Sequence, residues 1–586
     1  MSPSPSSFLS KKTKILFYHT NNANLKRYWV YSASLHLKTH IDLNFPDISD
    51  QLEWLLPIQK YHPDQKLVDL IDTLKPDIVC TSHYIWNHML LMDQFREVKK
   101  LVAKKFILIA GGPSINPNDD SDFFTKFDFV DFAVYGPGEQ AFGDIIASLI
   151  TQKKLIAFNT SNCAWVDKEK QKTIVAPYKF VPMSSASPYL HNRKLFSEMV
   201  KAAQNDADID NPERVNLAYT LTRGCPYSCT FCDWNSGLGN KVSRRKNTYK
   251  EEIDLFHELG LYEMYLSDAN VGQYDEDIDM VAYFGEKNTK QGAQFRLAGN
   301  FSKLRKDANL KIWHTMAQNK LLHPNEGFNF SVQDTNQQVL ENIDRPDVGW
   351  DKHVEIAQDL RMHYPNCLIT VQIIFGLPGQ TVASWRQTLR DITKQNMLPR
   401  IFINEPLPAS PAMYDPEYQE KFQYEYVETW RMFDLYLTAK ETKVLLPKKC
   451  FSFGQQDIAE MSVTGGIYQI LAFIQWCAIS ESRPPIDVEY LVDAIIAQPL
   501  YRELVDNLYN NWVEKNSFTI NNNIFTIFDR PSISGESSHL FAAFAFSQDF
   551  IKLLLSLARG ESKSTIAYLY FKKIIEKKFM DYGTDF

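Results

Sequence analysis

The sequence predicts an α/β protein with three structural parts. These are an N-terminal Rossmann-like, doubly wound sheet, a central partial (β/α)6 TIM-like barrel and a mostly helical C-terminal domain. Short apolar runs alternate with amphipathic helical patterns over residues 14–149, and the same alternation resumes at residue 216. Strands that alternate with helices indicate βαβ units and parallel sheets. From about residue 418 the strand pattern stops and helical periodicity follows.

The first part is assigned to residues 13–176, after a disordered tail at 1–12. Its expected strands are 14–19, 77–84, 106–113 and 130–136, separated by helical patterns such as 66–74 and 90–105, and a hairpin appendage spans 155–176. Ligands of such sheets bind at the loops beyond the carboxyl ends of the strands. Two glycine-rich loops at these ends, 111–113 and 136–139, therefore predict a site where the backbone approaches a bulky ligand.

A polar linker is expected at residues 177–213, followed by the barrel at 214–411. The candidate barrel strands are 216–222, 263–268, 294–299, 328–333, 368–376 and 400–406. Catalytic groups of such barrels lie at the carboxyl ends of the strands. Residues 412–586 form the expected helical domain, with helices near 430–440, 457–479 and 571–579.

Composition narrows the class of protein. The 586-residue chain carries a net charge of −7, which argues against nucleic acid as an obligatory partner, because phosphate binding needs a basic surface. The N-terminus lacks the apolar core of a secretory signal. The most apolar long run, 465–479, is short for a membrane span and contains two glutamines. We therefore expect a cytoplasmic protein without a membrane span, in which this run is a buried helix.

Three of the eight cysteines lie within eight residues, at Cys225, Cys229 and Cys232, directly after the first barrel strand. A [4Fe–4S] cube held by three thiolates keeps one iron open for a small chelator, such as the amino and carboxylate groups of a methionine. Phe231 is placed to pack on an adenine. The alternatives are a chance cluster and a zinc site, which would need a fourth ligand that is not evident nearby.

The pattern C-x-x-x-C-x-φ-C, filled by Cys225, Cys229, Phe231 and Cys232, resembles the motif of the radical S-adenosylmethionine (SAM) superfamily. The resemblance extends from residue 216 to about 411. It implies that the three cysteines hold a [4Fe–4S] cluster. It also implies reductive cleavage of SAM to methionine and a 5′-deoxyadenosyl radical, which abstracts hydrogen from an unactivated carbon.

Other strand ends resemble the cofactor contacts of this superfamily. Asp268 stands where the methionine amino group is met, although the usual glycines are missing. Ser331 and Gln333 resemble a polar pair for the methionine carboxylate or ribose. The loop with Gly376, Pro378 and Gly379 resembles one beside the adenine. The alternative for each of these positions is an ordinary loop residue.

The N-terminal part lacks the G-x-G-x-x-G of a dinucleotide site. It resembles instead the cobalamin-binding domain fused to one branch of radical SAM enzymes. The matching residues are Tyr84, Trp86, Asn87, Gly111, Gly112, Pro113, Gly136, Gly138 and Glu139. The D-x-H-x-x-G motif, whose histidine ligates cobalt in many cobalamin proteins, is absent. Trp86 is then either a side chain that covers the lower face of the corrin or an ordinary core residue. The alternative for the whole domain is that it no longer binds cobalamin.

The resemblance implies an enzyme that uses a [4Fe–4S] cluster, SAM and cobalamin, and we expect it to methylate an unactivated carbon through methylcobalamin. Two alternatives stay open: a cobalamin-dependent rearrangement or cyclisation without net methyl transfer, and a cofactor-binding sensor without turnover. The expected partners are a peptide or small natural product as substrate and an external electron donor such as flavodoxin or ferredoxin.

Overall fold

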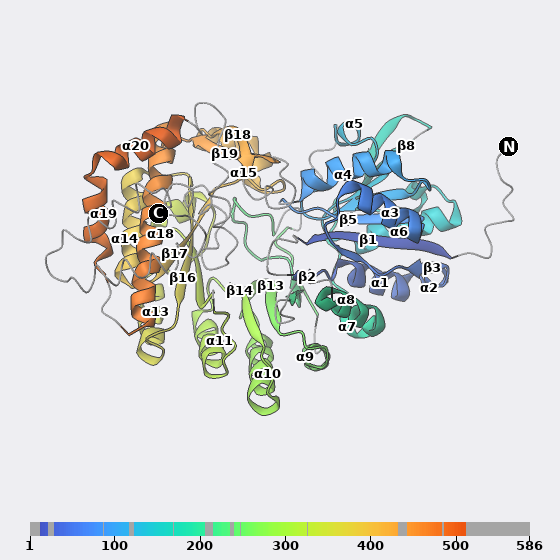
Figure 1. Ribbon diagram of the computed structural model, residues 1–586. Helices are drawn as coiled ribbons and strands as arrows, with labels where there is room; N and C mark the ends of the chain where they lie inside the picture. Colours follow the sequence, from blue (N-terminus) through green and yellow to red (C-terminus); the bar gives the residue numbers. More distant parts are fainter. Residues whose placement is uncertain are drawn as a thin grey trace.

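The N-terminal domain is built on a twisted sheet with the strand order β3–β1–β5–β6–β7–β8–β9, and β4 also pairs with β1 (Figure 1). The pairs from β3 to β7 are parallel, and β8 and β9 join antiparallel. The bounds are β1 Thr13–Asn21, β3 Leu52–Trp54, β4 Ile58–Lys60, β5 Ile78–Ser82, β6 Ile107–Gly111, β7 Phe132–Val134, β8 Cys163–Asp167 and β9 Lys172–Val175. The doubly wound fold and its hairpin are thus confirmed.

This computed structural model describes residues 12–21, 28–85, 87–115, 122–167, 169–205, 215–234, 239–245, 248–324, 326–431, 442–482 and 486–510.

Helices cover both faces of the N-terminal sheet because its strands are apolar on both sides. In β1, Ile15 and Phe17 join one core cluster, whereas Leu16 and Tyr18 join the other, as the alternation of side chains along a strand requires. The first face carries α1 (Ala33–Asn44), α2 (Pro46–Ser49) and α6 (Glu139–Thr151). The second carries α3 (Asp64–Leu74), α4 (His88–Leu101) and α5 (Phe123–Lys126).

The central barrel consists of two adjoining parallel sheets, β2–β10–β13–β14 and β15–β16–β17, with β14 next to β15. The six predicted strands appear as β10 Val215–Tyr219, β13 Glu263–Val271, β14 Arg296–Phe301, β15 Phe328–Gln333, β16 Ile369–Phe375 and β17 Leu398–Ile403. The outer layer comprises α9 (Tyr249–Glu258), α10 (Asp275–Gln291), α11 (Lys306–Gln318), α12 (Gln337–Asn342), α13 (Trp350–His363) and α14 (Val382–Lys394).

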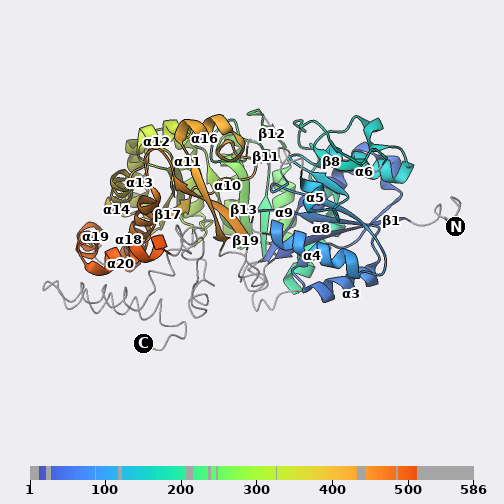
Figure 2. The ribbon, with the colours of Figure 1, turned by 90° about the horizontal axis from the view of Figure 1, so that it is seen from above.

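The N-terminal segment also contributes an edge strand to the barrel. β2 (Tyr28–Val30) pairs in parallel with β10, with Tyr28 opposite Val215. The sequence analysis places residue 28 within the doubly wound domain, so the two domains are more closely joined than their linear order indicates. Seen from above, the two lobes lie side by side, with β11 (Thr222–Arg223) and β12 (Ser243–Arg244) between them (Figure 2). In Figure 1, β2 also lies between the lobes.

The segment expected as a linker contains two helices, α7 (Pro188–His191) and α8 (Arg193–Asn205). In α8, Phe196, Met199, Val200 and Ala203 are buried in the barrel core cluster. Their spacing places them on one helical face. The polar runs at 182–188 and 205–213 gave this segment the composition of a linker, whereas the apolar spacing between them is that of a docked helix.

The region after the barrel begins with two short helices and a hairpin, and residues 430 and 431 of the helix expected at 430–440 belong to the first strand of this hairpin. Short helices α15 (Pro411–Tyr414) and α16 (Pro416–Phe422) lead into β18 (Glu425–Arg431), which pairs antiparallel with β19 (Thr442–Lys449). Residues 432–440 and the expected helix at 571–579 lie outside the described residues. The strand β18 contains β-branched and aromatic residue types, which favour strands over helices. They are Tyr426, Val427, Thr429 and Trp430.

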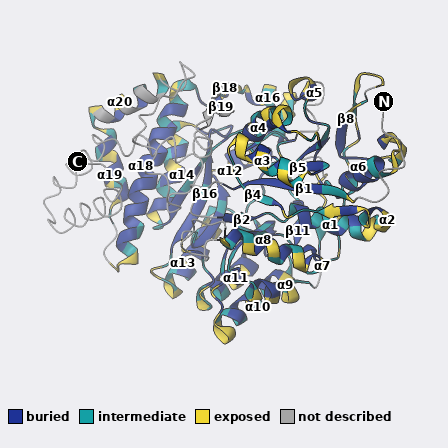
Figure 3. Ribbon diagram, turned by 45° about the vertical axis from the view of Figure 1, so that its right-hand side comes forward, coloured by how far each residue is buried: buried dark blue, intermediate teal, exposed yellow. Residues whose placement is uncertain are grey.

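The helices that follow are α18 (Gln455–Ser480), α19 (Val488–Ile496) and α20 (Pro499–Leu508). Among the described residues α18 alone has the length and hydropathy of a membrane span, but 89% of its apolar window is buried inside the fold (Figure 3). It packs on α14, where the indole N–H of Trp385 donates to the carbonyl of Met461 at 2.9 Å. The expected buried helix is confirmed.

Candidate active site between the two domains

A cavity of about 1170 Å³ opens between the carboxyl ends of the N-terminal strands and the mouth of the barrel. One wall comes from the loops after β5, β6 and β7. The opposite wall comes from the cysteine loop and from the segment after β17. Of the predicted ligand residues, Tyr84, Gly111, Gly112, Pro113, Gly136, Gly138 and Glu139 line this cavity, together with Arg223, Asp233, Trp234, Leu407, Pro408, Ala409 and Tyr414 from the other side.

Two glycines set the shape of the N-terminal wall. Gly112 has φ +118°, and a Cβ there would lie 2.5 Å from the carbonyl oxygen of His83. Gly136 has φ +58°, and its Cβ would lie 2.3 Å from the hydroxyl of Tyr178. Only glycine takes these conformations without strain and leaves the needed space. The glycines therefore let the loops after β6 and β7 pack closely against His83 and Tyr178, and both glycines and Tyr178 line the cavity.

One further predicted ligand residue has a different position. Asn87 is buried, accepts from the backbone N–H of Tyr84 at 2.7 Å, and donates to Thr20 and to the carbonyl of Ser82. It therefore orders the loop after β5 and does not line the cavity. Trp86 lies outside the described residues.

The cysteine loop leaves the short strand β11 (Thr222–Arg223) and begins with Gly224, whose φ is +88°. Cys225 and Cys229 are buried, and Cys232 is partly buried. Burial raises the pKa of the Cys232 thiol to about 12. The ammonium of Lys303 lies 3.8 Å from the sulfur of Cys225 and 3.7 Å from that of Cys229, so one cation sits against two of the three predicted ligands.

Lys303 follows the end of β14 and lies over the ring of Tyr227, 4.5 Å from its centroid. The side-chain amide of Asn270, near the end of β13, donates to the sulfur of Cys225 at 3.3 Å. Two neighbouring barrel strands thus supply polar groups to the thiols, as expected at this end of a barrel. Sequence reasoning missed both residues, because only the fold shows which strand end faces the cysteines.

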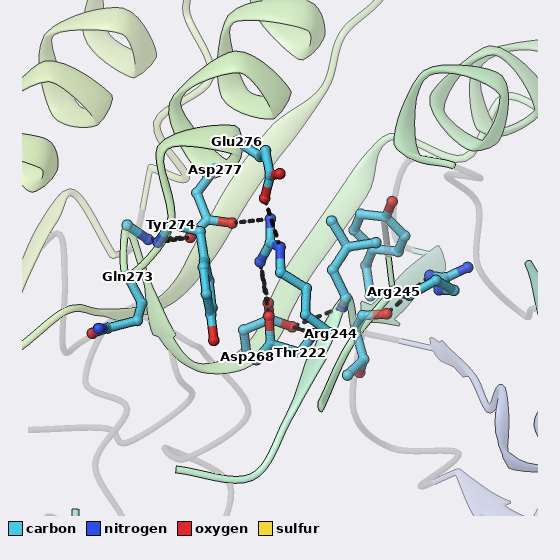
Figure 4. A network of polar contacts seen from close by, with 12 residues as sticks. Thr222, Arg244, Arg245, Asp268, Gln273, Tyr274, Glu276 and Asp277 are labelled. Atoms are coloured by element: carbon cyan, nitrogen blue, oxygen red, sulfur yellow. Dashed lines mark hydrogen bonds and ion pairs between the residues drawn. The ribbon is translucent and has the colours of Figure 1, made fainter. Parts of the chain in front are cut away.

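Asp268 anchors the start of the cysteine loop (Figure 4). Its Oδ1 accepts from the backbone N–H groups of Leu221 at 2.8 Å and Thr222 at 2.9 Å. Burial raises the pKa of Asp268 to about 6, although these hydrogen bonds oppose the rise. The sequence analysis expects Asp268 to meet a methionine amino group, whereas in the structure Oδ1 of its carboxylate is already bonded to the chain.

Arg244 ties this anchor to the next helix. It lies in β12 (Ser243–Arg244), which pairs with β11. Its guanidinium donates to Thr222 Oγ1 at 2.8 Å and to Asp277 at 2.7 Å, and approaches Asp268 Oδ2 to 3.8 Å (Figure 4). The adjacent Arg245 forms a fully buried ion pair with Glu252. The base of the cysteine loop is therefore rigid, as a preorganised site requires.

Apart from Asp268 and Phe231, the predicted SAM residues lie in or after strands of the second barrel sheet. Ser331 donates to Gln372 at 2.7 Å, and Gln333 has φ +75° at a bulge in β15. Gly376 and Gly379 have φ +83° and +97°, so the glycines are required there. The carbonyl of Pro378 accepts from Asn342 at 2.9 Å. Phe231 packs against the apolar cluster of Val339, Leu340, Ile343, Ile374 and Leu377, which brings the cysteine loop to this loop.

The comparisons with known proteins agree with this arrangement. The model of the radical SAM superfamily matches residues 219–392. The chain is 29% identical over 339 residues to the cobalamin-dependent radical SAM methyltransferase TokK of Streptomyces tokunonensis, covering 56% of this chain and 46% of that protein. It is 28% identical over 314 residues to the 2-(S-pantetheinyl)-carbapenam-3-carboxylate methyltransferase of Streptantibioticus cattleyicolor, covering 53% and 44%. The chain thus spans less than half the length of these curated relatives.

Among solved structures, the chain resembles the radical SAM methyltransferase TsrM of Kitasatospora setae, determined with cobalamin and a [4Fe–4S] cluster bound. The TM-score is 0.56 at 11% identity, over 94% of this chain and 100% of that one. This likeness concerns the fold, and it covers both the doubly wound domain and the barrel. The resemblance drawn from the cysteine motif is confirmed: the chain contains a radical SAM domain and shares its overall fold with a cobalamin-binding radical SAM methyltransferase.

Proposed function

We propose that this protein is a cobalamin-dependent radical SAM methyltransferase that modifies an unactivated carbon of a small natural product. The observation that carries the proposal is that one cavity is lined by residues of both domains. The loops that match a cobalamin domain form one wall, and Arg223, Asp233 and Trp234, which flank the cysteines, form part of the other. Two cofactors bound in this way would face each other without a protein layer between them.

The residues present fit a [4Fe–4S] cluster. Three thiols lie in one loop, two of them buried and both beside the same ammonium group. Three thiolates leave one iron for a chelating methionine. The Gly376–Gly379 loop and Phe231 lie close to each other through a shared apolar cluster, which supports the expectation that SAM binds across the second sheet.

The residues present also fit a corrin. Gly112 and Gly136 line the cavity, beside the side chain of Tyr178, and a Cβ at either glycine would collide with the protein. The cavity is large enough for a bulky planar ligand, because its volume is slightly above the range of about 300–1,000 Å³ that is usual for small-molecule and cofactor sites. Gly138, Glu139 and Tyr84 complete this wall.

When bound, the cluster and SAM supply a radical that removes a hydrogen atom, and the corrin supplies the methyl group. The chain has two tasks in this reaction. Asp268 and Arg244 hold the cysteine loop in place, and Arg223 and Glu139 join the two walls. Residues 407–409 and Tyr414 line one side of the cavity. An external one-electron donor, expected to be flavodoxin or ferredoxin, remains a prediction, as does the cytoplasmic location.

The substrate class rests on the relatives. One relative, TokK, is named a cobalamin-dependent radical SAM methyltransferase. The other is named a methyltransferase of 2-(S-pantetheinyl)-carbapenam-3-carboxylate, which is a small molecule. We therefore favour a small natural product over the peptide that the sequence analysis left open.

The test uses anaerobically reconstituted protein with cobalamin, reductant and SAM, and measures 5′-deoxyadenosine and S-adenosylhomocysteine together. The proposal predicts both products, and predicts that Cys229→Ala abolishes 5′-deoxyadenosine. Formation of 5′-deoxyadenosine alone in the presence of a carbapenam substrate would favour rearrangement or cyclisation. If neither product forms although the cluster is intact, the result would favour a cofactor-binding sensor without turnover.

A further inference from the structure

A second group of metal-binding side chains lies at the opposite end of the barrel from the cysteine loop. His314 is near the end of α11, and Asp359 and His363 are one turn apart near the end of α13. Because α11 follows β14 and α13 precedes β16, both helix ends lie beside the beginnings of barrel strands (Figure 1). Residues at this end of a barrel contribute to stability rather than to catalysis.

The three side chains converge on one point. One ligand atom from each lies within 4.8 Å of the other two. His314 Nε2 is 3.0 Å from Asp359 Oδ2, and His363 Nδ1 is 3.7 Å from Asp359 Oδ1. The two imidazole rings are 5.2 Å apart and nearly perpendicular. Small side-chain rotations bring these atoms to the spacing of ligands around one ion.

One tautomer of His314 leaves its Nε2 free to bind a metal. Its Nδ1 is 3.0 Å from the hydroxyl of Tyr364, and that hydroxyl is 3.5 Å from the backbone carbonyl of His314. If the hydroxyl hydrogen points to the carbonyl, the Tyr364 oxygen accepts from Nδ1–H. Nε2 then directs a lone pair at the Asp359 carboxylate. Two acceptors 3.0 Å apart repel each other unless a proton or a cation lies between them.

The second imidazole faces the same carboxylate through its Nδ1. This nitrogen also lies 2.9 Å from the backbone carbonyl of Asp359, so the ring of His363 must turn away from this carbonyl before Nδ1 binds an ion. Nε2–H is then left to donate to water, as the second ring nitrogen of a histidine ligand usually donates to an outer-shell acceptor.

The surroundings favour a cation with an open coordination position. The negative ends of two helix dipoles point to this place, and they favour positive charge. The side chains of His314, Asp359 and His363 are 25%, 34% and 51% exposed, so water can reach them. Two imidazole nitrogens, one carboxylate oxygen and one water make a tetrahedral set that suits Zn²⁺.

We propose that His314, Asp359 and His363 bind a Zn²⁺ ion that joins α11 to α13 at the base of the barrel. The ion holds the two outer helices together beside the first residues of β15 and β16. The site is separate from the cysteine loop, and it does not depend on the proposed catalytic function.

The test uses the cluster-reconstituted chain, in which iron occupies the cysteines, and titrates it anaerobically with Co²⁺ as a probe. We expect one equivalent to bind with visible d–d bands and without a thiolate-to-cobalt charge-transfer band, and Zn²⁺ to displace it. His363→Ala and Asp359→Asn should each weaken binding at least about tenfold, and Tyr364→Phe by about tenfold, the effect known for outer-shell partners.

The matched control is His191→Ala. His191 Nε2 also lies 3.0 Å from a carboxylate oxygen, of Asp42, and that carboxylate is paired with Lys38 rather than with a second imidazole. This variant should bind Co²⁺ as the wild type does. Zn²⁺ should also raise the unfolding midpoint of the wild type and of His191→Ala but not that of His363→Ala. No binding to the reconstituted wild type, or binding that survives both His363→Ala and Asp359→Asn, would overturn the proposal.

Discussion

Arg223 and Glu139 form a two-point ion pair across the boundary between the two domains. The guanidinium donates to the two carboxylate oxygens at 3.0 and 2.5 Å. Arg223 lies two residues before the first cysteine of the loop, and Glu139 begins α6 of the doubly wound domain. Both line the cavity, so the pair sets the position of one wall relative to the other.

Glu139→Gln should loosen this connection. Burial alone would raise the pKa of Glu139, but the Arg223 charge and its hydrogen bonds outweigh burial and lower it. The contribution to stability is therefore present at neutral pH and is lost as the pH falls below about 4.5, the usual pKa. We expect the variant to lose about 1–3 kcal/mol of unfolding free energy at pH 7 and to bind cobalamin more weakly.

The measurement is denaturant unfolding at several pH values. Glu139→Gln should lack the part of the acid destabilisation that the wild type shows below pH 4.5. A double-mutant cycle with Arg223→Met isolates the pair. Parallel pH curves for wild type and variant would contradict a role for this pair.

Asp268 gives a pH dependence of the opposite sign. Its pKa is raised to about 6 from 3.8, so the folded chain binds the proton more tightly than the unfolded chain. Stability then falls as the pH rises from about 4 to about 6, by up to about 3 kcal/mol. Asp268→Asn keeps an oxygen acceptor for the loop and should abolish this decline in the cluster-free protein.

Asp268→Ala removes both loop hydrogen bonds and should reduce the iron bound per chain after reconstitution, whereas Asp268→Asn should retain most of it. Iron analysis and the cluster absorbance distinguish the two variants. Equal loading of wild type, Asp268→Asn and Asp268→Ala would show that the loop does not need this anchor.

Lys303 should make the cluster easier to reduce. Its ammonium lies 3.7 Å from the Cys229 sulfur, and a nearby positive charge stabilises the more negative, reduced state. Lys303→Gln should lower the midpoint potential by on the order of tens of millivolts, measured by a redox titration followed by electron paramagnetic resonance. An unchanged potential in a fully loaded variant would mean that Lys303 turns away from the bound cluster.

Gly112→Ala tests the cavity wall. The new Cβ would lie 2.5 Å from the His83 carbonyl oxygen at a φ of +118°, so the loop must move, and we expect at least tenfold weaker cobalamin binding. Gly292→Ala is the matched control: it also has positive φ, +69°, but no atom lies within 4 Å of its Cβ. This control should cost about 1–2 kcal/mol of stability and bind cobalamin normally, as monitored by absorbance titration. Normal binding by both variants would place the corrin elsewhere.

The sequence was most informative where one residue type is required at one position. Glycines 112 and 136 predicted loops that approach a bulky ligand, and both glycines line the cavity. The six barrel strands followed from their apolar periodicity. These features are local. The spacing of Cys225, Cys229 and Cys232 identified the superfamily for the same reason, since one short loop carries the whole motif.

The features that the sequence did not reveal depend on which distant elements meet. The pairing of β2 with β10, the Arg223–Glu139 ion pair and the approach of Lys303 to the cysteines each join residues 74 to 187 positions apart. Asp268 was located at the correct strand end, but its partner, the backbone of residues 221 and 222, became visible only in three dimensions.

The central claim is that one cavity holds the corrin against the cluster loop. The most direct measurement is pulsed electron paramagnetic resonance on the anaerobic protein loaded with cob(II)alamin and the reduced [4Fe–4S] cluster. A short separation predicts a strong magnetic coupling that broadens or splits both signals, and predicts that Gly112→Ala weakens it with the loss of cobalamin. Two independent signals in fully loaded wild-type protein would contradict the account, because the two cofactors would then not share the cavity.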